Sequence, residues 1–271
     1  MKQTQGKFIL FDIAEFGNWL NTTPIYRVIK LIQNHHTWSP SYKHFKTNNH
    51  FSLLKGMENA HLERGFNQIA QNLTTFPDGS IAVCRPLNIT PAGIKGANTN
   101  GICIENIGNF DSNNDQMTNE HKDTIIKVNA LLCKKFNLTP STDTIVYHHW
   151  YDLTKGIRTN GTGSTKTCPG TAFFGGNKVS DAENNFIPLI NQDLNDLDHI
   201  QPIAIANILF TARVDSDTPL NIRVTPSASS KKVGELNNGS IVHVYEQNGV
   251  WGKIDPTEPH WVNGKFLEKI S

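Results

Sequence analysis

The chain has 271 residues, of which 37% are hydrophobic and 18% charged, a composition typical of a folded protein with one or two domains. Its 25 lysines and arginines nearly balance its 24 acidic residues, and this net charge of +1 disfavours nucleic acid and anionic membrane surfaces as partners. No stretch approaches the roughly 18–20 apolar residues of a membrane span, so we expect no membrane insertion.

The N-terminal region lacks the features of a signal peptide. The apolar run from Phe8 to Phe11 is short and is followed closely by Asp12 and Glu15. The four cysteines show neither a CxxC pair nor the spacing of a disulfide framework, which favours a reducing compartment at synthesis.

Short β-type runs alternate with helical patterns over the first 195 residues, which predicts an α/β domain. In chain order we expect a strand and a helix within residues 7–20, a strand from Tyr26 to Gln33, a hairpin of residues 68–76 and 80–85 around Pro77-Asp78-Gly79, a strand over 101–107, a helix over 119–136, a strand over 143–149 and a helix over 182–194.

After Phe210 the pattern changes to short alternating runs separated by turn signals, which is typical of a small all-β domain. We therefore predict a catalytic domain over residues 1–195, a linker over 196–210 and a C-terminal domain over 211–271.

Three segments carry possible metal ligands next to predicted strand ends or loops: the pair His35 and His36, the pair His148 and His149, and Cys168. Two imidazoles and one thiolate form a known catalytic zinc set that leaves a fourth position for water. Taken singly, each residue is equally typical of a structural histidine or a small buried cysteine.

The ordered combination resembles a family. The patterns Leu31-Ile32-x-x-His35-His36-Thr37, Ile145-Val146-x-His148 and Lys166-x-Cys168-Pro169-Gly170 are similar to those of the zinc amidases of the T7 lysozyme and peptidoglycan-recognition-protein superfamily. The resemblance covers roughly residues 25–175. It implies a mixed β-sheet with flanking helices and a Zn2+ cofactor held by His35, His148 and Cys168, with His149 as the alternative to His148.

The resemblance also implies the chemistry. The scissile bond would be the amide between N-acetylmuramic acid and L-alanine in peptidoglycan, so that glycan strand and stem peptide are both partners. Glu105 lies in a segment similar to the one that supplies a carboxylate base, and Lys166 takes the place of an active-site lysine. The chain departs from the family where other members carry a tyrosine, because it has Phe66-Asn-Gln-Ile-Ala-Gln71 there.

Aromatic and polar residues flank the candidate ligands and suit a groove for sugar and peptide. We select Trp38, Tyr42, Trp150 and Arg158 as substrate-binding candidates, although aromatic packing in the core or rim explains such residues equally well.

The C-terminal residues 211–271 resemble a bacterial SH3 domain, through Leu220-Asn221-Ile222-Arg223-Val224, Trp251-Gly252-Lys253-Ile254 and Trp261-Val262. The resemblance implies a module that binds cell-wall peptides; packing on the enzyme or dimerisation is the alternative.

The leading hypothesis is a zinc amidase that acts on the cell wall as a monomer. The alternatives are a non-catalytic peptidoglycan-binding protein, a thiol peptidase with Cys168 as nucleophile, and an adhesion protein. Without a visible signal peptide, we expect release by lysis through a holin, non-classical export, or a cytoplasmic location at synthesis.

Overall fold

The computed structural model describes residues 2–199, 208–255 and 258–270, and the chain divides into two compact units, Met1–Asp196 and Leu197–Ser271. The predicted linker, residues 196–210, includes residues 200–207, which lie outside the described residues. The proposed domain limits therefore stay a prediction.

A mixed sheet forms the centre of the first unit, with strand order β1-β2-β5-β4-β6-β3-β7. Strands β4, β6, β3 and β7 are parallel, whereas β1, β2 and β5 continue the sheet by antiparallel pairing. The strand bounds are β1 Gln3–Gln5, β2 Phe8–Phe11, β3 Leu31–His36, β4 Leu73–Thr75, β5 Ile81–Val83, β6 Gly101–Asn106 and β7 Ile145–Tyr147.

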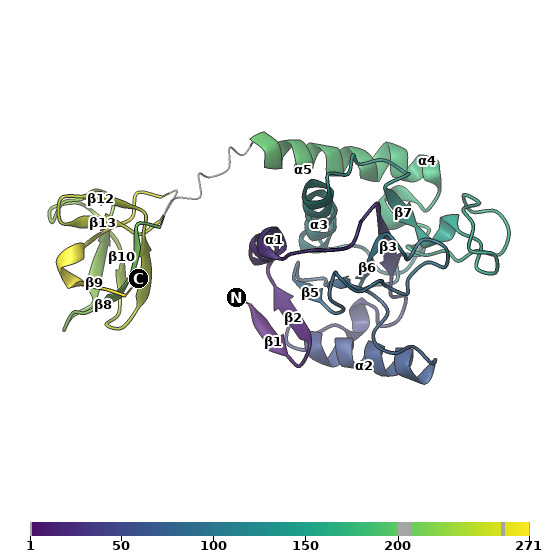
Figure 1. Ribbon diagram of the computed structural model, residues 1–271, viewed down its shortest axis with the longest axis horizontal. Helices are drawn as coiled ribbons and strands as arrows, with labels where there is room; N and C mark the ends of the chain where they lie inside the picture. The colour runs from purple at the N-terminus through teal and green to yellow at the C-terminus, as the bar shows by residue number, and fades with distance from the viewer. Residues whose placement is uncertain (1, 200–207, 256–257, 271) are drawn as a thin grey trace. The chain divides into compact units, whose positions relative to one another are not determined.

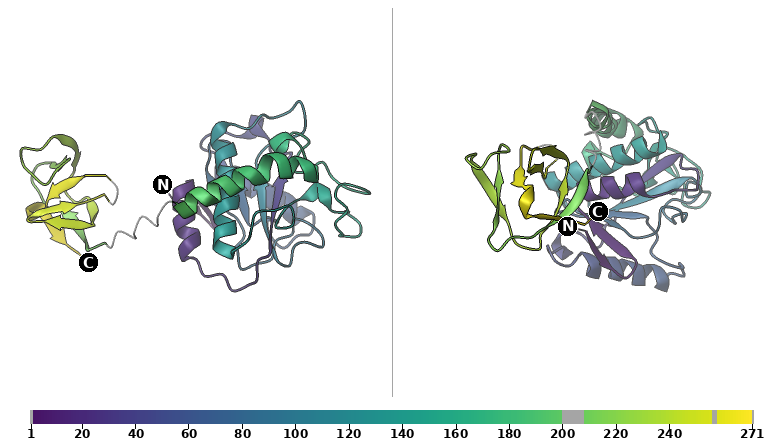
Figure 2. Two further views of the ribbon diagram at one scale, coloured as in Figure 1. Left: turned by 90° about the horizontal axis from the view of Figure 1, so that it is seen from above. Right: turned by 60° about the vertical axis from the view of Figure 1, so that its left-hand side comes forward.

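Helices cover both faces of this sheet (Figures 1 and 2). Helices α1, α3 and α5 lie on one side, with α5 outermost, and α2 lies on the other. The predicted mixed α/β fold is confirmed. The helix bounds are α1 Ile13–Thr22, α2 His50–Glu63, α3 Asn119–Phe136, α4 Val179–Asp181, which continues into a π-helical turn Ala182–Phe186, and α5 Ile187–His199; 3-10 turns span Tyr42–His44, His148–Trp150 and Phe173–Gly175.

Helix α3 has the bounds that its sequence predicts. The Thr118 side chain accepts a hydrogen bond from the His121 N–H and caps the first turn, while Ile125, Val128 and Leu132 form a buried stripe at helical spacing. Asn137, in the left-handed conformation with φ 53°, ends the helix.

One predicted element needs correction, and one helix was missed. The strand expected from Tyr26 begins only at Leu31, and Tyr26 is 85% exposed. Helix α2 was not predicted, because its buried side includes His50 and Glu58 among the apolar Leu54 and Met57, which interrupts the periodic pattern. It packs on the sheet in a cluster that includes Leu54, Met57, Ile69, Phe76, Ala82 and Ile107.

The second unit is all-β, as predicted. Its strands form two sheets in the orders β10-β9-β14-β13-β12 and β11-β8-β15, around a core of Val214, Leu220 and Val262. The bounds are β8 Phe210–Val214, β9 Leu220–Arg223, β10 Lys232–Leu236, β11 Ile241–Val244, β12 Glu246–Asn248, β13 Trp251–Lys253, β14 Trp261–Asn263 and β15 Leu267–Lys269, with a 3-10 turn over Gly264–Phe266.

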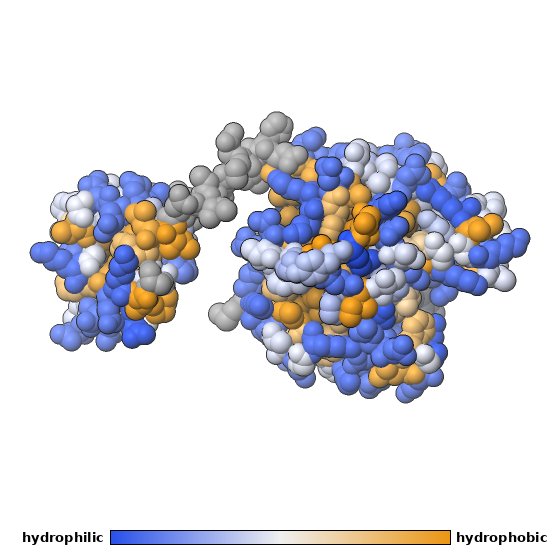
Figure 3. Space-filling view, in the orientation of Figure 1, coloured by the Kyte–Doolittle hydropathy of each residue, from blue (hydrophilic) through white to orange (hydrophobic). Residues whose placement is uncertain are grey.

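The visible surface is mainly hydrophilic, with apolar residues interspersed in small groups (Figure 3). Across the described residues, no helix combines the length and the apolar character that a membrane crossing requires.

Candidate metal centre

The parallel strands bring the candidate residues to one edge of the sheet. His35 and Glu105 occupy paired positions near the carboxyl ends of β3 and β6, and His148 directly follows β7. Since parallel strands all end at the same edge, residues far apart in the sequence meet there. Cys168 joins them from the loop that precedes Pro169.

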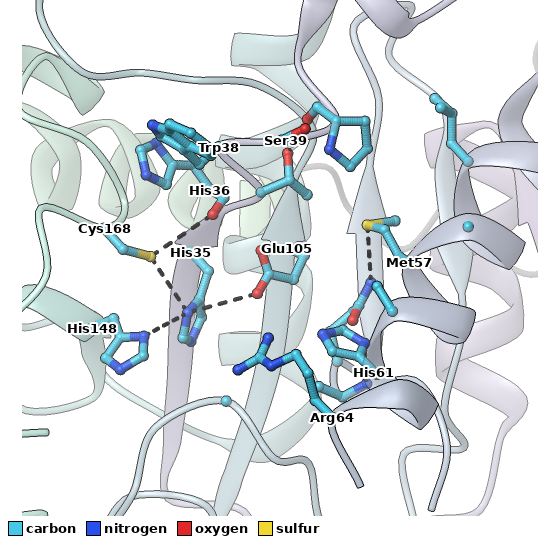
Figure 4. A pocket seen from close by; sticks show the side chains of 18 of the residues that line it. His35, His36, Trp38, Ser39, Met57, His61, Arg64, Glu105, His148 and Cys168 are labelled. Carbon is cyan, nitrogen blue, oxygen red and sulfur yellow. Dashed lines mark hydrogen bonds and ion pairs between the residues drawn. The ribbon is translucent and has the colours of Figure 1, made fainter. Parts of the chain in front are cut away.

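His35, His148 and Cys168 point toward one another (Figure 4), and their donor atoms all lie within 4.8 Å of each other. The Nδ1 atom of His35 lies 3.3 Å from Nδ1 of His148 and 3.5 Å from Sγ of Cys168. Bonds of about 2.1–2.3 Å to one tetrahedral ion hold such atoms roughly 3.4–3.8 Å apart. The donor set and its spacing therefore fit a zinc ion.

The neighbouring histidines use their Nδ1 atoms outside the cluster, although His36 also lines the cavity described below. His36 accepts a hydrogen bond at Nδ1 from the Phe110 N–H at 3.1 Å. His149 Nδ1 contacts the carbonyl oxygen of Lys166 at 2.7 Å, which requires the imidazole to donate. The geometry favours His148 over His149 as the second ligand, and the ligand set stays a prediction.

Burial sets the protonation of the three donors. It lowers the pKa of His35 well below its usual value and that of His148 to about 4, so both imidazoles are neutral at pH 7 and have a free lone pair. Burial also raises the pKa of the Cys168 thiol well above its usual range.

Glu105 lies beside this cluster, with its carboxylate Oε1 at 3.8 Å from Nδ1 of His35. Burial raises its pKa to about 8, and the positive charge of Lys166 opposes the rise. At pH 7 Glu105 is therefore mostly protonated in the metal-free site, and a bound cation would favour its carboxylate form.

A cavity of about 710 Å³ opens over the cluster and is lined by Glu105, Lys166 and all three candidate ligands. Trp38 forms part of its wall and is 62% exposed. Its backbone adopts φ 57°, which is uncommon for a bulky residue, and its N–H donates to the Gly108 carbonyl oxygen at 2.9 Å.

A model of the N-acetylmuramoyl-L-alanine amidase family matches residues 25–171, more than half of the chain. The chain belongs to this amidase family. A model of the bacterial SH3 domain matches residues 218–268, and the predicted resemblance is confirmed for both parts. The chain has no match among curated protein sequences.

Among solved structures, this chain is similar to N-acetylmuramoyl-L-alanine amidase LysC from Clostridium intestinale URNW, with 22% identity, 56% of this chain and 84% of that chain covered, and a TM-score of 0.40. Drosophila PGRP-LB is 19% identical, with 59% of this chain and 83% of that chain covered and a TM-score of 0.45. Apis mellifera PGRP-SA is 17% identical, with 62% of this chain and 92% of that chain covered and a TM-score of 0.42. Family membership rests on the family model alone.

Three of the predicted substrate-binding residues do not line the cavity. Trp150 is fully buried and its indole N–H donates to the Asn177 carbonyl oxygen, so it is a core residue. The Tyr42 hydroxyl is 2.8 Å from Nδ1 of His121. Arg158 stacks on Trp150 and pairs with Asp143.

Proximity in sequence to a ligand does not fix the direction of a side chain, so the roles proposed for Tyr42, Trp150 and Arg158 stay predictions that the cavity does not support. Trp38, by contrast, does line the cavity.

Helix α2 and the residue that follows it supply cavity residues that sequence reasoning missed, above all Met57, His61 and Arg64. Their spacing of four and three residues places them on one helical face, which is the signal that could have revealed them. Arg64 stacks on the Phe66 ring at 5.3 Å, and no ion pair joins it to an acidic group within the described residues. Its charge is available to a ligand.

Proposed function

We propose that this protein is a zinc-dependent N-acetylmuramoyl-L-alanine amidase that hydrolyses the amide bond between N-acetylmuramic acid and L-alanine in peptidoglycan. One observation carries the proposal: two imidazoles and a thiol converge at the floor of a large cavity, with a carboxylate 3.8 Å from one of them. Membership of the amidase family supports the same reaction.

In this proposal His35, His148 and Cys168 hold the metal. Bound zinc supplies Lewis acidity, which polarises a carbonyl group and makes a water molecule more acidic. The second function of these residues is to fix the position of the reaction relative to the cavity walls. The parallel strands β3 and β7 make that position rigid.

Glu105 moves the proton. It accepts a proton from the attacking water and returns it to the nitrogen of the leaving L-alanine, which departs as a neutral amine. Glu105 is suited to this because its carboxylate faces the same point as the three ligands, from the adjacent strand β6. The backbone of Glu105 is held on both sides, because β6 pairs with β3 and with β4, and this fixes its distance from the ligands.

Lys166 and the cavity walls bind the substrate. Lys166 lies at the cavity beside Cys168 and places positive charge where the carbonyl oxygen becomes negative. Trp38 offers an exposed aromatic face for a sugar ring, and Arg64 offers a guanidinium group for a carboxylate of the stem peptide. The cavity thus has a place for glycan and for peptide.

The SH3 domain, in this proposal, keeps the enzyme on the cell wall by binding peptidoglycan peptides. The family match to residues 218–268 supports this assignment. A wall-binding module favours intact wall over soluble fragments as substrate, because a second binding site raises the effective concentration of the enzyme at an extended polymer.

The test is zinc content by mass spectrometry together with release of stem peptides from purified peptidoglycan. Wild type is compared with Cys168→Ser. We expect about one zinc per chain and new L-alanine amino termini, both lost in the variant. Metal-free wild type that still sediments with peptidoglycan would refute the enzyme and establish a recognition protein.

A further inference from the structure

The buried side chain of Gln33 lies next to the candidate ligand His35, and the proposed reaction assigns it no role. Gln33 is fully buried on β3, two residues before His35, so both side chains point to the same face of the sheet. A buried amide is costly unless its hydrogen bonds are satisfied, and its partners therefore show what holds it there.

The partners of Gln33 fix which way its amide points. Its Nε2 lies 2.9 Å from the carbonyl oxygen of Ala97 and 3.3 Å from Oδ1 of Asn98. The Ala97 carbonyl can only accept, so the NH2 group must face it. The oxygen Oε1 then faces His35, at 3.4 Å from Nε2 of the imidazole.

This orientation selects one tautomer of His35. An amide oxygen only accepts, so it favours the imidazole that carries its proton on Nε2. Nδ1 is then left with its lone pair, and Nδ1 is the atom that faces His148 and Cys168. The opposite tautomer would direct a proton into the cluster of donors and would leave Oε1 without a donor.

We propose that Gln33 is a positioning residue, which locks His35 in the Nε2–H tautomer and so prepares Nδ1 as a metal ligand. The inference rests on the proposed function in taking zinc as the metal. Partners behind a metal-bound histidine typically contribute about 10–100-fold in metal affinity.

The backbone packs closely against the amide of Gln33 at two glycines. A side chain at Gly93 would overlap Oε1 of Gln33, and its Cβ would lie 3.0 Å from Nε2 of His35. A Cβ at Gly101 would lie 2.7 Å from both Nε2 of Gln33 and the Ala97 carbonyl oxygen. These glycines let the backbone approach closely and enclose the amide on two sides.

The Asn98 side chain holds the loop that contains Gly93 against the Gln33 amide. Its Oδ1 accepts from the N–H groups of Gly93 and Ile94, each at 2.9 Å, as well as from Gln33. One network of hydrogen bonds therefore connects the loop, the Gln33 amide and the His35 imidazole. Asn98 links Gly93 to Gln33 within this network.

The first experiment measures the tautomer directly in metal-free protein. Nitrogen-15 NMR at pH 8 distinguishes the two ring nitrogens of His35, assigned by comparison with His35→Ala. We expect a protonated Nε2 in wild type and a mixture of tautomers in Gln33→Met, which keeps the side-chain length but cannot accept strongly. A wild-type His35 protonated on Nδ1 would overturn the proposal, whether or not the protein binds zinc.

The second experiment measures zinc affinity by competition with a chelator. We expect Gln33→Met to weaken binding about 10–100-fold. Asn34→Leu is the matched control: it removes a buried amide from the same strand, but one that bonds Asn129 on the opposite face, at 2.8 Å. Its zinc affinity should stay within about threefold of wild type.

Equal affinity of Gln33→Met and wild type would overturn the positioning role. If Gln33→Met does not fold, the tautomer of His35 in the wild-type protein still decides the proposal. A wild type that binds no zinc would instead contradict the proposed function, and the NMR result would still decide the role of Gln33.

Discussion

Each face of strand β3 carries one side-chain amide and one histidine, but the two faces have different surroundings. Gln33 and His35 point to one face, and Asn34 and His36 to the other. On the first face the histidine meets His148 and Cys168 beneath an open cavity. On the second the histidine accepts a backbone N–H from Phe110, and the amide pairs with one on α3.

This contrast teaches that residue type does not decide which histidine can bind a metal. All four side chains are buried, and burial lowers the pKa of both histidines. What differs is whether the second partner of the imidazole leaves a nitrogen free. The Nδ1 atom of His36 accepts a backbone hydrogen bond, whereas the Nδ1 atom of His35 faces the cluster of candidate ligands.

Replacing each histidine in turn should give the largest difference. We expect His35→Ala to lose zinc and about a thousandfold or more of the amidase activity, because the metal loses one of three ligands. His36→Ala should keep zinc but destabilise the fold by about 1–3 kcal/mol, since the Phe110 N–H loses its partner. Zinc content, peptide release and urea unfolding measure this, and equal zinc loss in both would contradict it.

Glu105→Gln tests the carboxylate on the neighbouring strand. The amide keeps the shape but cannot take a proton, so we expect a loss of about 10²–10⁴-fold in kcat with zinc content unchanged. Glu58→Gln is the control, because Glu58 is also buried but pairs with Lys7 and Lys55 away from the cavity. It should lower the Tm and leave kcat intact. A Glu105→Gln enzyme with wild-type kcat would exclude the proton-transfer role.

Arg64→Ala extends the comparison to the cavity wall. We expect KM for stem-peptide substrates to rise by about 5–20-fold with kcat within about twofold, because a charge-assisted hydrogen bond to a carboxylate is lost. Lys55→Ala removes a positive charge from the same helix but outside the cavity, and should leave KM unchanged. If both variants raise KM alike, the effect is one of general charge.

The last prediction concerns His121, a buried histidine on α3 that lies outside the metal centre. Its ring nitrogens lie 2.8 Å from the Tyr42 hydroxyl and from Oγ1 of Thr75, and burial lowers its pKa to about 3. The unfolded chain, with a histidine pKa of about 6.5, binds the proton more readily, so stability falls as pH drops from about 6.5 toward 3.

Between pH 7 and pH 5 the His121 contribution is about 2 kcal/mol of unfolding free energy. Urea unfolding of metal-free protein at both pH values should show the loss, and His121→Gln should show a smaller difference between them. An unchanged pH difference in the variant would assign the acid sensitivity to other groups.

Local pattern and motif spacing were enough for much of this protein. The stripe of Ile125, Val128 and Leu132 predicted α3, since a 3.6-residue period is a property of a single segment. Motif order also predicted the family and the SH3 domain, which the family models confirm. Helix α2 was missed because His50 and Glu58 are buried against partners elsewhere in the chain, Asp78 and Lys7.

The sequence by itself determined the family, the α/β fold class and the short set of residues from which a metal site can be built. Only the tertiary structure decided among them. It turned His148 to the cluster and His149 to a carbonyl, and it buried Trp150 while exposing Trp38. It also set Gln33 behind His35. The reason is physical: side-chain direction and burial depend on partners that arrive from distant segments, and a local pattern contains no information about them.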